Sequence, residues 1–272
     1  MNARRAAVTT SAPALALAPA LALVLALALG LAACADEVPA GSRLERTRLL
    51  AVVAGPVDEP ARAWPSAGEL AQVRALVVAP GQAPPVRWHL EVCCTAAGAL
   101  AHAEDGVGDP VVRFAVPPEV HALRVAGVIE PQGEPATDFV YDLPVARDGV
   151  TNHHPRLAQV DLPQECAVAG GPAQPLRVLT AADARETYAR AEGGVAREPL
   201  RLSFFASAGE LARQFAVVEA ADPAETSEVT MAWTPPPVEE VPPEGLTVRI
   251  VIVARDLRGG VDFTSRTLCV QH

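Results

Sequence analysis

The chain has 272 residues and a formal net charge of −10 at pH 7, and all 22 basic residues are arginine. Because nucleic-acid binding rests on clustered positive charge, this acidic balance argues against a nucleic-acid partner. The chain contains 26 prolines and 19 glycines and is only 4% aromatic. Frequent prolines punctuate short extended segments and interrupt helices, so we expect an all-β protein.

The first 33 residues are typical of a secretory signal peptide. Arg4 and Arg5 precede residues 12–33, which carry no charge and are rich in Leu and Ala. A basic start, an apolar run and a small-residue end are the three parts of such a signal. The unbroken apolar run after Pro19 covers about a dozen residues, fewer than the roughly 20 that span a bilayer. A retained transmembrane helix is therefore the weaker alternative.

The last residues of this run, Leu31-Ala32-Ala33-Cys34, resemble the lipobox of bacterial lipoproteins. The resemblance implies cleavage before Cys34 and acylation of its thiol by fatty acids such as palmitate, which would anchor the chain to a membrane of the cell envelope. Ala35 follows the cysteine and Asp36 is third, so the enteric retention signal is not matched and the outer membrane is favoured. Whether the protein faces the periplasm or the surface stays open. An ordinary signal peptide with a chance cysteine is the alternative.

Four further cysteines follow: Cys93, Cys94, Cys166 and Cys269. An even number in an exported chain favours up to two disulfides, with three possible connectivities. Cys166 follows the first strand expected in the second half and Cys269 lies on the last, and such strands can be neighbours in a sandwich, so we favour a Cys166–Cys269 bond. Cys93 and Cys94 either bond to each other or leave Cys94 buried and reduced. No paired CxxC spacing indicates a zinc site.

Period-two alternation of apolar and polar residues predicts strands throughout the chain. In residues 85–94 the odd-even pattern is clearest, because one set of positions is apolar (Val86, Trp88, Leu90, Val92) and the other is polar (Arg87, His89, Glu91). His89 is therefore expected on the surface. The other strands expected in the first half cover residues 47–56, 68–78, 110–117, 120–128 and 138–146.

In the second half, strands are expected over residues 157–162, 174–180, 198–207, 213–220, 226–233, 245–256 and 260–270. The last two are joined by a tight hairpin at 256–260, since glycines there accept positive φ. Residues 181–192 could form either a helix or an extended strand. We place a lipidated tether at 34–46, a first domain at 47–148, a polar linker at 149–156 and a second domain at 157–272.

The second half carries a resemblance to a known architecture. The segment EVTMAWTPPP, residues 228–237, and the strands after it are similar to the closing part of Ig-like and PKD-like domains. The chain as a whole resembles the tandem Ig-like lipoproteins of delta-proteobacteria such as myxobacteria, more specifically over 155–272 than over 47–148. This resemblance implies two Ig-like β-sandwich domains in tandem on a lipid anchor, and it implies no catalytic residues.

Motifs for catalysis and metal binding are absent from the sequence. Ser203 and Ser207 have no histidine nearby in sequence, and there is no Gly-x-Ser-x-Gly, phosphate loop, HExxH or EF-hand motif. The adjacent His153 and His154 would point to opposite sides of an extended chain, so we expect a solvated linker rather than a metal site. Three acidic residues on an expected loop could offer oxygen ligands to Ca²⁺: Glu104, Asp105 and Asp109. Solvated turn residues are favoured, because the DxDxDG spacing is absent.

These observations favour a non-catalytic function. Rigid sandwiches on a membrane anchor would bind an envelope protein or a glycan through their loops, because function on such folds lies in loops. A structural spacer subunit of an envelope assembly is the alternative, and a hydrolase is a distant third. We expect no cofactor apart from the covalent lipid on Cys34.

Overall fold

The computed structural model describes residues 41–94, 98–163, 165–189 and 193–272. The predicted signal peptide, Cys34 and residues 34–40 of the predicted tether lie outside this part of the chain. From Gly41 to His272 the chain forms one compact unit. Among the described residues, the regular elements are strands apart from a single 3₁₀ turn, η1 (Val238–Glu240), so the prediction of an all-β fold is confirmed. None of the described residues belongs to a helix long and apolar enough to cross a membrane.

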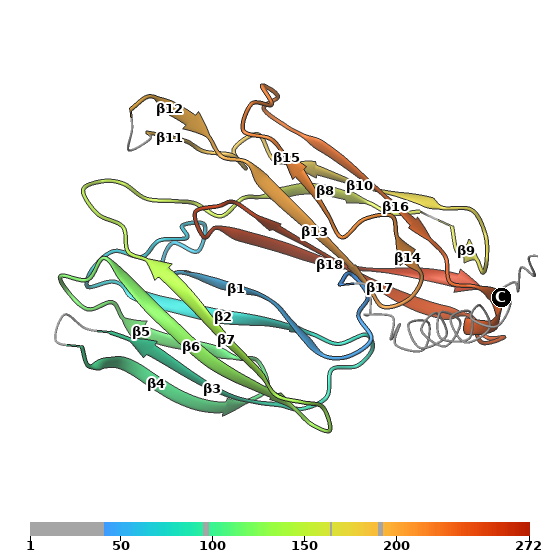
Figure 1. Cartoon of the computed structure of the whole chain (residues 1–272), viewed down its shortest axis with the longest axis horizontal. Coiled ribbons are helices and arrows are strands. Elements are labelled where there is room, and N and C mark those ends of the chain that lie inside the picture. The colour runs from blue at the N-terminus through green and yellow to red at the C-terminus, as the bar shows by residue number, and fades with distance from the viewer. Residues whose placement is uncertain (1–40, 95–97, 164, 190–192) are drawn as a thin grey trace, which may run out of the picture. The chain divides into compact units, whose positions relative to one another are not determined.

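The first seven strands form a sandwich of two antiparallel sheets (Figure 1). One sheet has the order β1-β2-β5 and the other has the order β4-β3-β6-β7. A cluster of buried apolar side chains from both sheets, with Trp88 among them, fills the space between. The strands are β1 (Arg48–Pro56), β2 (Leu70–Val78), β3 (Val86–Cys93), β4 (Leu100–Val107), β5 (Val111–Ala115), β6 (Ala122–Pro131) and β7 (Thr137–Pro144).

The remaining strands form a second sandwich and a small hairpin. Its sheets have the orders β14-β16-β10-β8 and β15-β13-β17-β18-β9, and β11 pairs only with β12. Trp233 and Phe204 are fully buried in the core between the two larger sheets. The strands are β8 (Leu157–Asp161), β9 (Ala167–Val168), β10 (Gln174–Thr180), β11 (Thr187–Ala189), β12 (Val195–Arg197), β13 (Leu200–Ala206), β14 (Glu210–Leu211), β15 (Phe215–Val218), β16 (Glu228–Thr234), β17 (Leu246–Arg255) and β18 (Val261–Gln271).

The clearest alternating segments fold as predicted. The four apolar positions of β3 are buried, and β17 and β18 pair in register from Leu246↔Val270 to Arg255↔Val261 as a hairpin. Part of the ambiguous segment 181–192 is extended, because β11 pairs with β12. Residues 103–107 of the acidic segment expected as a loop are instead part of strand β4, which pairs along β3 despite its polar sequence, whereas Asp109 lies in the turn after the strand. A neighbouring strand supplies backbone hydrogen bonds whatever the side-chain pattern, and so it overrides a weak sequence signal.

A third apolar cluster joins the two sandwiches. It contains Val251 and Val253, which lie on the face of β17 opposite to the core positions Ile250 and Ile252, so β17 is buried on both faces. Strands buried on both faces are apolar at nearly every position, which explains the continuous run in this segment. We call this cluster the apolar joint; its buried members are Leu44, Leu50, Ala51, Leu76, Val78, Phe205, Val251, Val253 and Val261.

Residues 41–46 are packed against the second sandwich and do not form a free tether, which corrects the expectation for this part of the chain. The backbone N–H of Leu44 donates to the carbonyl of Ala206 at 2.8 Å, and the N–H of Ala206 donates to the carbonyl of Ser42 at 2.9 Å. Leu44 is fully buried in the apolar joint. Burial of Leu44 together with these backbone hydrogen bonds docks a segment whose average composition is polar.

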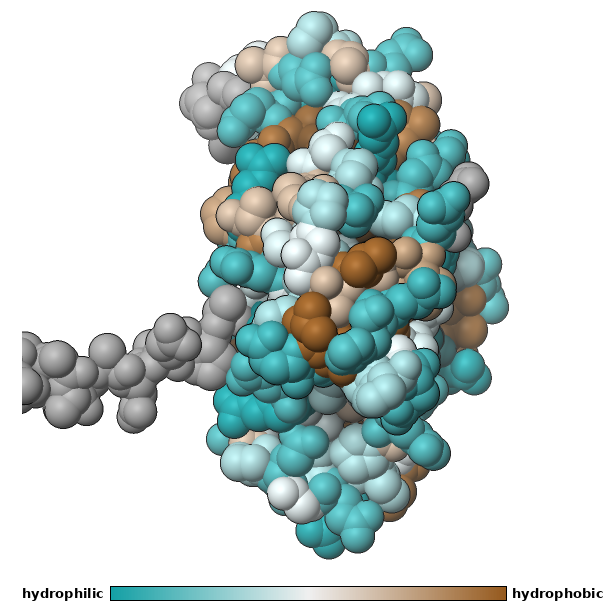
Figure 2. Space-filling view, turned by 90° about the vertical axis from the view of Figure 1, so that its right-hand side faces the viewer, coloured by the Kyte–Doolittle hydropathy of each residue, from teal (hydrophilic) through white to brown (hydrophobic). Residues whose placement is uncertain are grey.

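The surface shown in Figure 2 is hydrophilic over most of its area, and apolar residues form small separate groups on it. Among the described residues, the most exposed large apolar side chains are Leu257 at 76%, Val107 at 72% and Val195 at 70%.

Candidate functional site

The outer face of the sheet β4-β3-β6 carries a hollow of about 450 Å³. Cross-strand pairing brings its lining together, because His89 lies opposite Asp105 on β4 and Arg87 lies opposite Glu130 on β6. These positions alternate with the buried residues of β3, so their side chains point away from the core. The full lining is Arg87, Trp88, His89, Asp105, Gly106, Val107, Val128 and Glu130.

A second hollow of about 690 Å³ adjoins the first and shares Arg87, Val107 and Glu130 with it. It continues to the turn between β6 and β7, where Glu134 accepts hydrogen bonds from the backbone N–H and the hydroxyl of Thr47, each at 2.8 Å. These bonds fix the turn to the start of the first sandwich. We call the two together the outer-sheet hollows.

Ion pairs line the first hollow. The imidazole of His89 bonds to Glu91 through Nε2 at 3.1 Å and to Asp105 through Nδ1 at 2.8 Å, and Arg87 pairs with Glu130 at 3.1 Å. The hydrogen bonds with Glu91 and then Asp105 raise the pKa of His89 above its ordinary value of 6.5. Cationic and anionic groups thus alternate around the small apolar side chain of Val107. None of the side chains lining either hollow is a Ser, Thr or Cys nucleophile. The hydrogen-bond donors and acceptors of the lining can bond to a polar ligand.

The three acidic residues weighed as Ca²⁺ ligands are not brought together. Glu104 bonds to His102 at 3.1 Å and Asp109 contacts Arg74 at 3.4 Å. Asp105 bonds to His89 at 2.8 Å. Consecutive residues on a strand face opposite sides, which separates Glu104 from Asp105. The described part of the chain holds no group of three or more His, Cys, Asp and Glu side chains placed to bind a metal ion.

The expectation of a solvated linker around His153 and His154 is wrong. His153 Nδ1 bonds to the carboxylate of Glu186, and His154 Nδ1 accepts a hydrogen bond from the N–H of Val261 at 2.9 Å. Burial lowers the pKa of His154 below 6.5, which keeps the ring neutral at pH 7 and able to accept this bond. The neighbouring Asn152 is fully buried. Both histidines therefore hold the linker to the second sandwich.

Arg258, in the turn between β17 and β18, lies at the centre of a polar joint beside this linker. Its guanidinium contacts Glu198 at 2.7 Å and Glu186 at 3.3 Å and donates to the carbonyl of Thr151 at 2.7 Å. It also lies 4.7 Å from the ring centroid of Trp64, whose Nε1–H donates to the Arg258 carbonyl at 2.8 Å. Trp64 belongs to the first sandwich, so this contact holds the hairpin of the second sandwich against the first.

We call this network the Arg258 joint; its members are Trp64, Thr151, Glu186, Tyr188, Glu198 and Arg258, with Tyr188 5.0 Å from the guanidinium. Glu198 is only 1% exposed, and burial raises its pKa above 4.5 although Arg258 opposes the shift. No sequence signal singles out these residues, because the partners of Arg258 lie 60 to 194 positions away in the chain.

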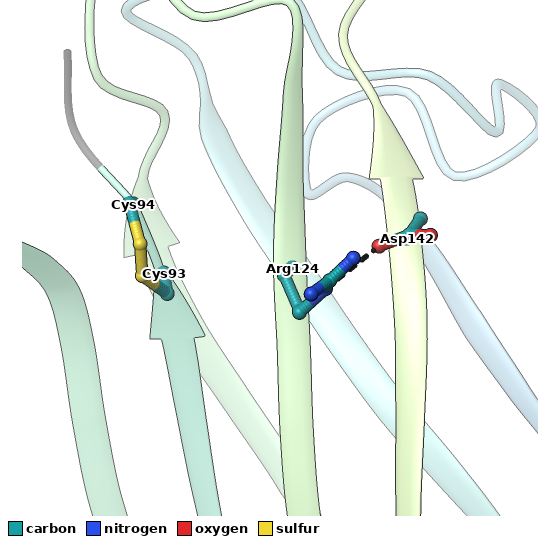
Figure 3. The surroundings of a disulfide bond; sticks show 4 residues. All are labelled: Cys93, Cys94, Arg124 and Asp142. Atoms are coloured by element: carbon teal, nitrogen blue, oxygen red, sulfur yellow. Dashed lines mark hydrogen bonds and ion pairs between the residues drawn. A yellow bond between two sulfur atoms is a disulfide. The ribbon is translucent and has the colours of Figure 1, made fainter. Parts of the chain in front are cut away.

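Both pairs of cysteines are disulfide-bonded in the structure. Cys166 is bonded to Cys269, with 4.7 Å between their Cα atoms, beside the parallel pairing of β9 with β18. Cys93 is bonded to Cys94 at the end of β3 (Figure 3), which is one of the two alternatives left open for this pair. Cys34, the predicted lipidation site, lies outside the described residues.

The two serines considered as nucleophiles have structural partners. Ser207 Oγ accepts a hydrogen bond from the N–H of Arg249 at 2.9 Å, and Ser203 is buried with Arg255 at 3.5 Å from its hydroxyl. Neither hydroxyl contacts a histidine in the described part of the chain. Their environment gives no reason to assign them a catalytic role.

Comparisons with known proteins bear on the fold. No protein-family model matches the chain, and no curated protein matches it in sequence. Similar solved structures include red sea bream transglutaminase, at 14% identity and a TM-score of 0.29 over 85% of this chain and 32% of that chain. Another is DIP-gamma IG1+IG2, at 10% identity and a TM-score of 0.21 over 84% of this chain and 98% of that chain.

A third is the dimeric latent PorU of Porphyromonas gingivalis, at 9% identity and a TM-score of 0.25 over 84% of this chain and 24% of that chain. This chain thus spans about a third of the transglutaminase and about a quarter of PorU. Structural similarity at this level gives no information about activity, substrate or partners. It accompanies an all-β sandwich fold that the strand pairings establish.

Proposed function

We propose that this chain is a non-catalytic binding or scaffolding module of the cell envelope, anchored through an acylated Cys34 and with the outer membrane favoured as its location. The observation that carries the binding role is the pair of adjoining hollows on the outer face of β4-β3-β6. Their volumes, about 450 and 690 Å³, lie in the range of about 300–1,000 Å³ that is typical of ligand sites.

The lining of the hollows supports a polar ligand. Arg87 and His89 offer hydrogen-bond donors, and Asp105 and Glu130 offer acceptors, all on a sheet whose core face is fully packed. A glycan or an extended peptide presents hydroxyl or amide groups that can form hydrogen bonds with both the donors and the acceptors of the lining. Rigid strands keep these groups in place before the ligand arrives, which reduces the entropy cost of binding.

The role of a spacer subunit is the second candidate, and the two joints between the sandwiches favour it. The apolar joint and the Arg258 joint contain buried contacts from both sandwiches, so the two sandwiches would move as one rigid body and would not bend at the linker. A rigid body on a short anchor is what holding an assembly at a fixed distance from a membrane requires.

Binding is tested with protein released from its anchor, offered to a glycan array and to an envelope extract. Val107 is 72% exposed and lines both hollows, whereas Val168 is 59% exposed on β9 in the other sandwich. We expect Val107→Arg to abolish capture of the ligand and Val168→Arg, the matched control, to leave it unchanged. Equal binding by both variants would refute the hollows as the site. A stoichiometric envelope partner retained by both variants would support the spacer instead.

The anchor has its own test. Intact-mass spectrometry of membrane-extracted protein is expected to show a chain that begins at Cys34 and carries fatty acids. The variant Cys34→Ser is expected to lose both the added mass and the membrane association. An unacylated chain of unchanged length would contradict the anchor.

A further inference from the structure

The bond between Cys93 and Cys94 lies where strand β3 ends, and both residues are half-buried. Cys93 is opposite Leu100 on β4 and Arg124 on β6. In Figure 3 the side chain of Arg124 turns away from the two sulfur atoms and toward Asp142, with which it pairs at 3.1 Å. The two sulfur atoms thus lie at the end of β3, and the Arg124 side chain pairs with Asp142 instead of approaching them.

This disulfide contributes little to holding the fold together. In the chain-entropy model a disulfide stabilises a protein by closing a loop in the unfolded chain, and the effect grows with the logarithm of loop length. Cys93 and Cys94 are adjacent, so their bond closes almost no loop. The end of β3 is held instead by its ladder to β6 and by the fully buried Val92 and Val125. Opening the bond therefore leaves the surrounding core in place.

The second disulfide is an internal contrast. Cys166 and Cys269 are 103 positions apart, and their bond fixes the segment before β9 to the last strand, β18. Reduction of this bond frees a long loop in the unfolded chain and loosens an edge of the larger sheet. Because the fold and this disulfide stabilise each other, the bond requires a more reducing environment to open in the folded protein than in the unfolded chain.

We propose that Cys93–Cys94 is a thiol–disulfide exchange site that accepts two electrons from an external dithiol while the protein stays folded. A thiolate of the dithiol attacks one sulfur atom, the Cys93–Cys94 bond breaks, and the released sulfur takes up a proton. The second thiol of the dithiol then displaces the first cysteine from the mixed disulfide. The products are two thiols on this chain and one disulfide on the reductant, so two electrons and two protons have been transferred. This inference is independent of the proposed binding function, and it needs an external dithiol to open the bond and an oxidant to re-form it.

Adjacency also makes the reaction reversible. The two thiols stay next to each other along the chain, so an oxidant meets both at once and re-forms the bond without a search by the chain. Partial exposure of both residues gives the attacking thiolate access. An adjacent, accessible pair can therefore cycle between its two states in the folded protein.

The test is a redox titration of the full chain, extracted from membranes, without denaturant. Samples are equilibrated with increasing ratios of reduced to oxidised dithiothreitol, trapped by alkylation and mapped by peptide mass spectrometry. We expect Cys93 and Cys94 to become alkylated at a ratio at which Cys166 and Cys269 are still bonded. The urea midpoint should stay unchanged while only the adjacent pair is reduced. Returning the sample to excess oxidised dithiothreitol, which accepts two electrons and two protons from the two thiols, should restore the bond.

Two paired variants complete the test. The double variant Cys93→Ser, Cys94→Ser should keep the parental urea midpoint and show no alkylation at low ratios. The double variant Cys166→Ser, Cys269→Ser should have a lower midpoint and leave the titration of Cys93 and Cys94 unchanged. Reduction of both disulfides at the same ratio, a fall in the midpoint with reduction of the adjacent pair, or resistance of that pair until the protein unfolds would each overturn the proposal.

Discussion

Replacing Arg258 by alanine should destabilise the protein far more than the loss of an ordinary surface arginine. The guanidinium faces Glu198 at 2.7 Å, and the carboxylate side chain is only 1% exposed while that of Arg258 is 15% exposed. Breaking a buried ion pair by removing one partner costs about 3–5 kcal/mol, because the other charge is left without compensation. The partial exposure of Arg258 puts the expected loss at the lower end, about 3 kcal/mol, or about 6–12 °C in Tm for a unit of this size.

The stability lost in Arg258→Ala should increase with pH. Burial raises the pKa of Glu198 above 4.5, while hydrogen bonds from the Glu186 backbone and from Arg258 oppose the rise. Between the unfolded and the folded pKa, the folded protein holds more protons than the unfolded chain. The stability from protonated Glu198 is therefore fully present below about pH 4.5 and is lost as pH rises through the folded pKa. Without Arg258 the pKa rises further, so the deficit of Arg258→Ala should grow from pH 5 to pH 8.

The assay is urea denaturation followed by tryptophan fluorescence at several pH values. Trp64 lies against Arg258 and reports on this joint. Arg266→Ala is the matched control, because Arg266 is exposed and its recorded hydrogen bond is to the carbonyl of Ser265 at 3.0 Å. If Arg258→Ala loses no more stability than Arg266→Ala, or if its deficit is the same at pH 5 and pH 8, the reasoning about the buried Glu198 is wrong.

Three other outcomes are expected. Leu44→Ala should lower the free energy of unfolding by about 2–5 kcal/mol, since Leu44 is fully buried, whereas a tether residue would show no change in urea denaturation. Trp233→Phe should lower the free energy of unfolding by about 1 kcal/mol more than Trp88→Phe. The indole N–H of Trp233 donates to the carbonyl of Ala208 at 3.0 Å, whereas that of Trp88 finds no partner among the described residues. Equal losses in the two variants would contradict this reasoning. NMR titration of the His89 imidazole should give a pKa above 6.5, raised by Glu91 and then by the carboxylate across the strand pair, and Glu91→Gln should lower it; no response would exclude the hydrogen bond as the cause.

The local pattern of the sequence was sufficient for the strands that bury one face. In β3 the alternation of Trp88 and Leu90 with polar residues predicts which side meets the core, and the structure buries that side. The hairpin between β17 and β18 follows in the same way from alternating strands around a glycine-containing turn. Side-chain period and turn chemistry are properties of a few consecutive residues, so they can be read without a fold.

The candidate site depended on which strands became neighbours. Arg87 and His89 were correctly placed on the polar face, but the hollow also needs Asp105 from a segment expected to be a loop. That segment is polar at most positions, and only pairing with β3 makes it a strand. The sequence contained the residues of the hollow and did not indicate their proximity.

The sequence by itself determined the all-β class and the faces of the alternating strands, because each depends on composition or on short-range order. Tertiary structure alone decided that Leu44 and the second face of β17 are buried, and that His153, His154 and Arg258 serve to hold the two sandwiches together. Those burials arise from contacts between residues as far apart as Trp64 and Arg258. No local pattern records such contacts, since the free energy that favours them depends on two surfaces meeting.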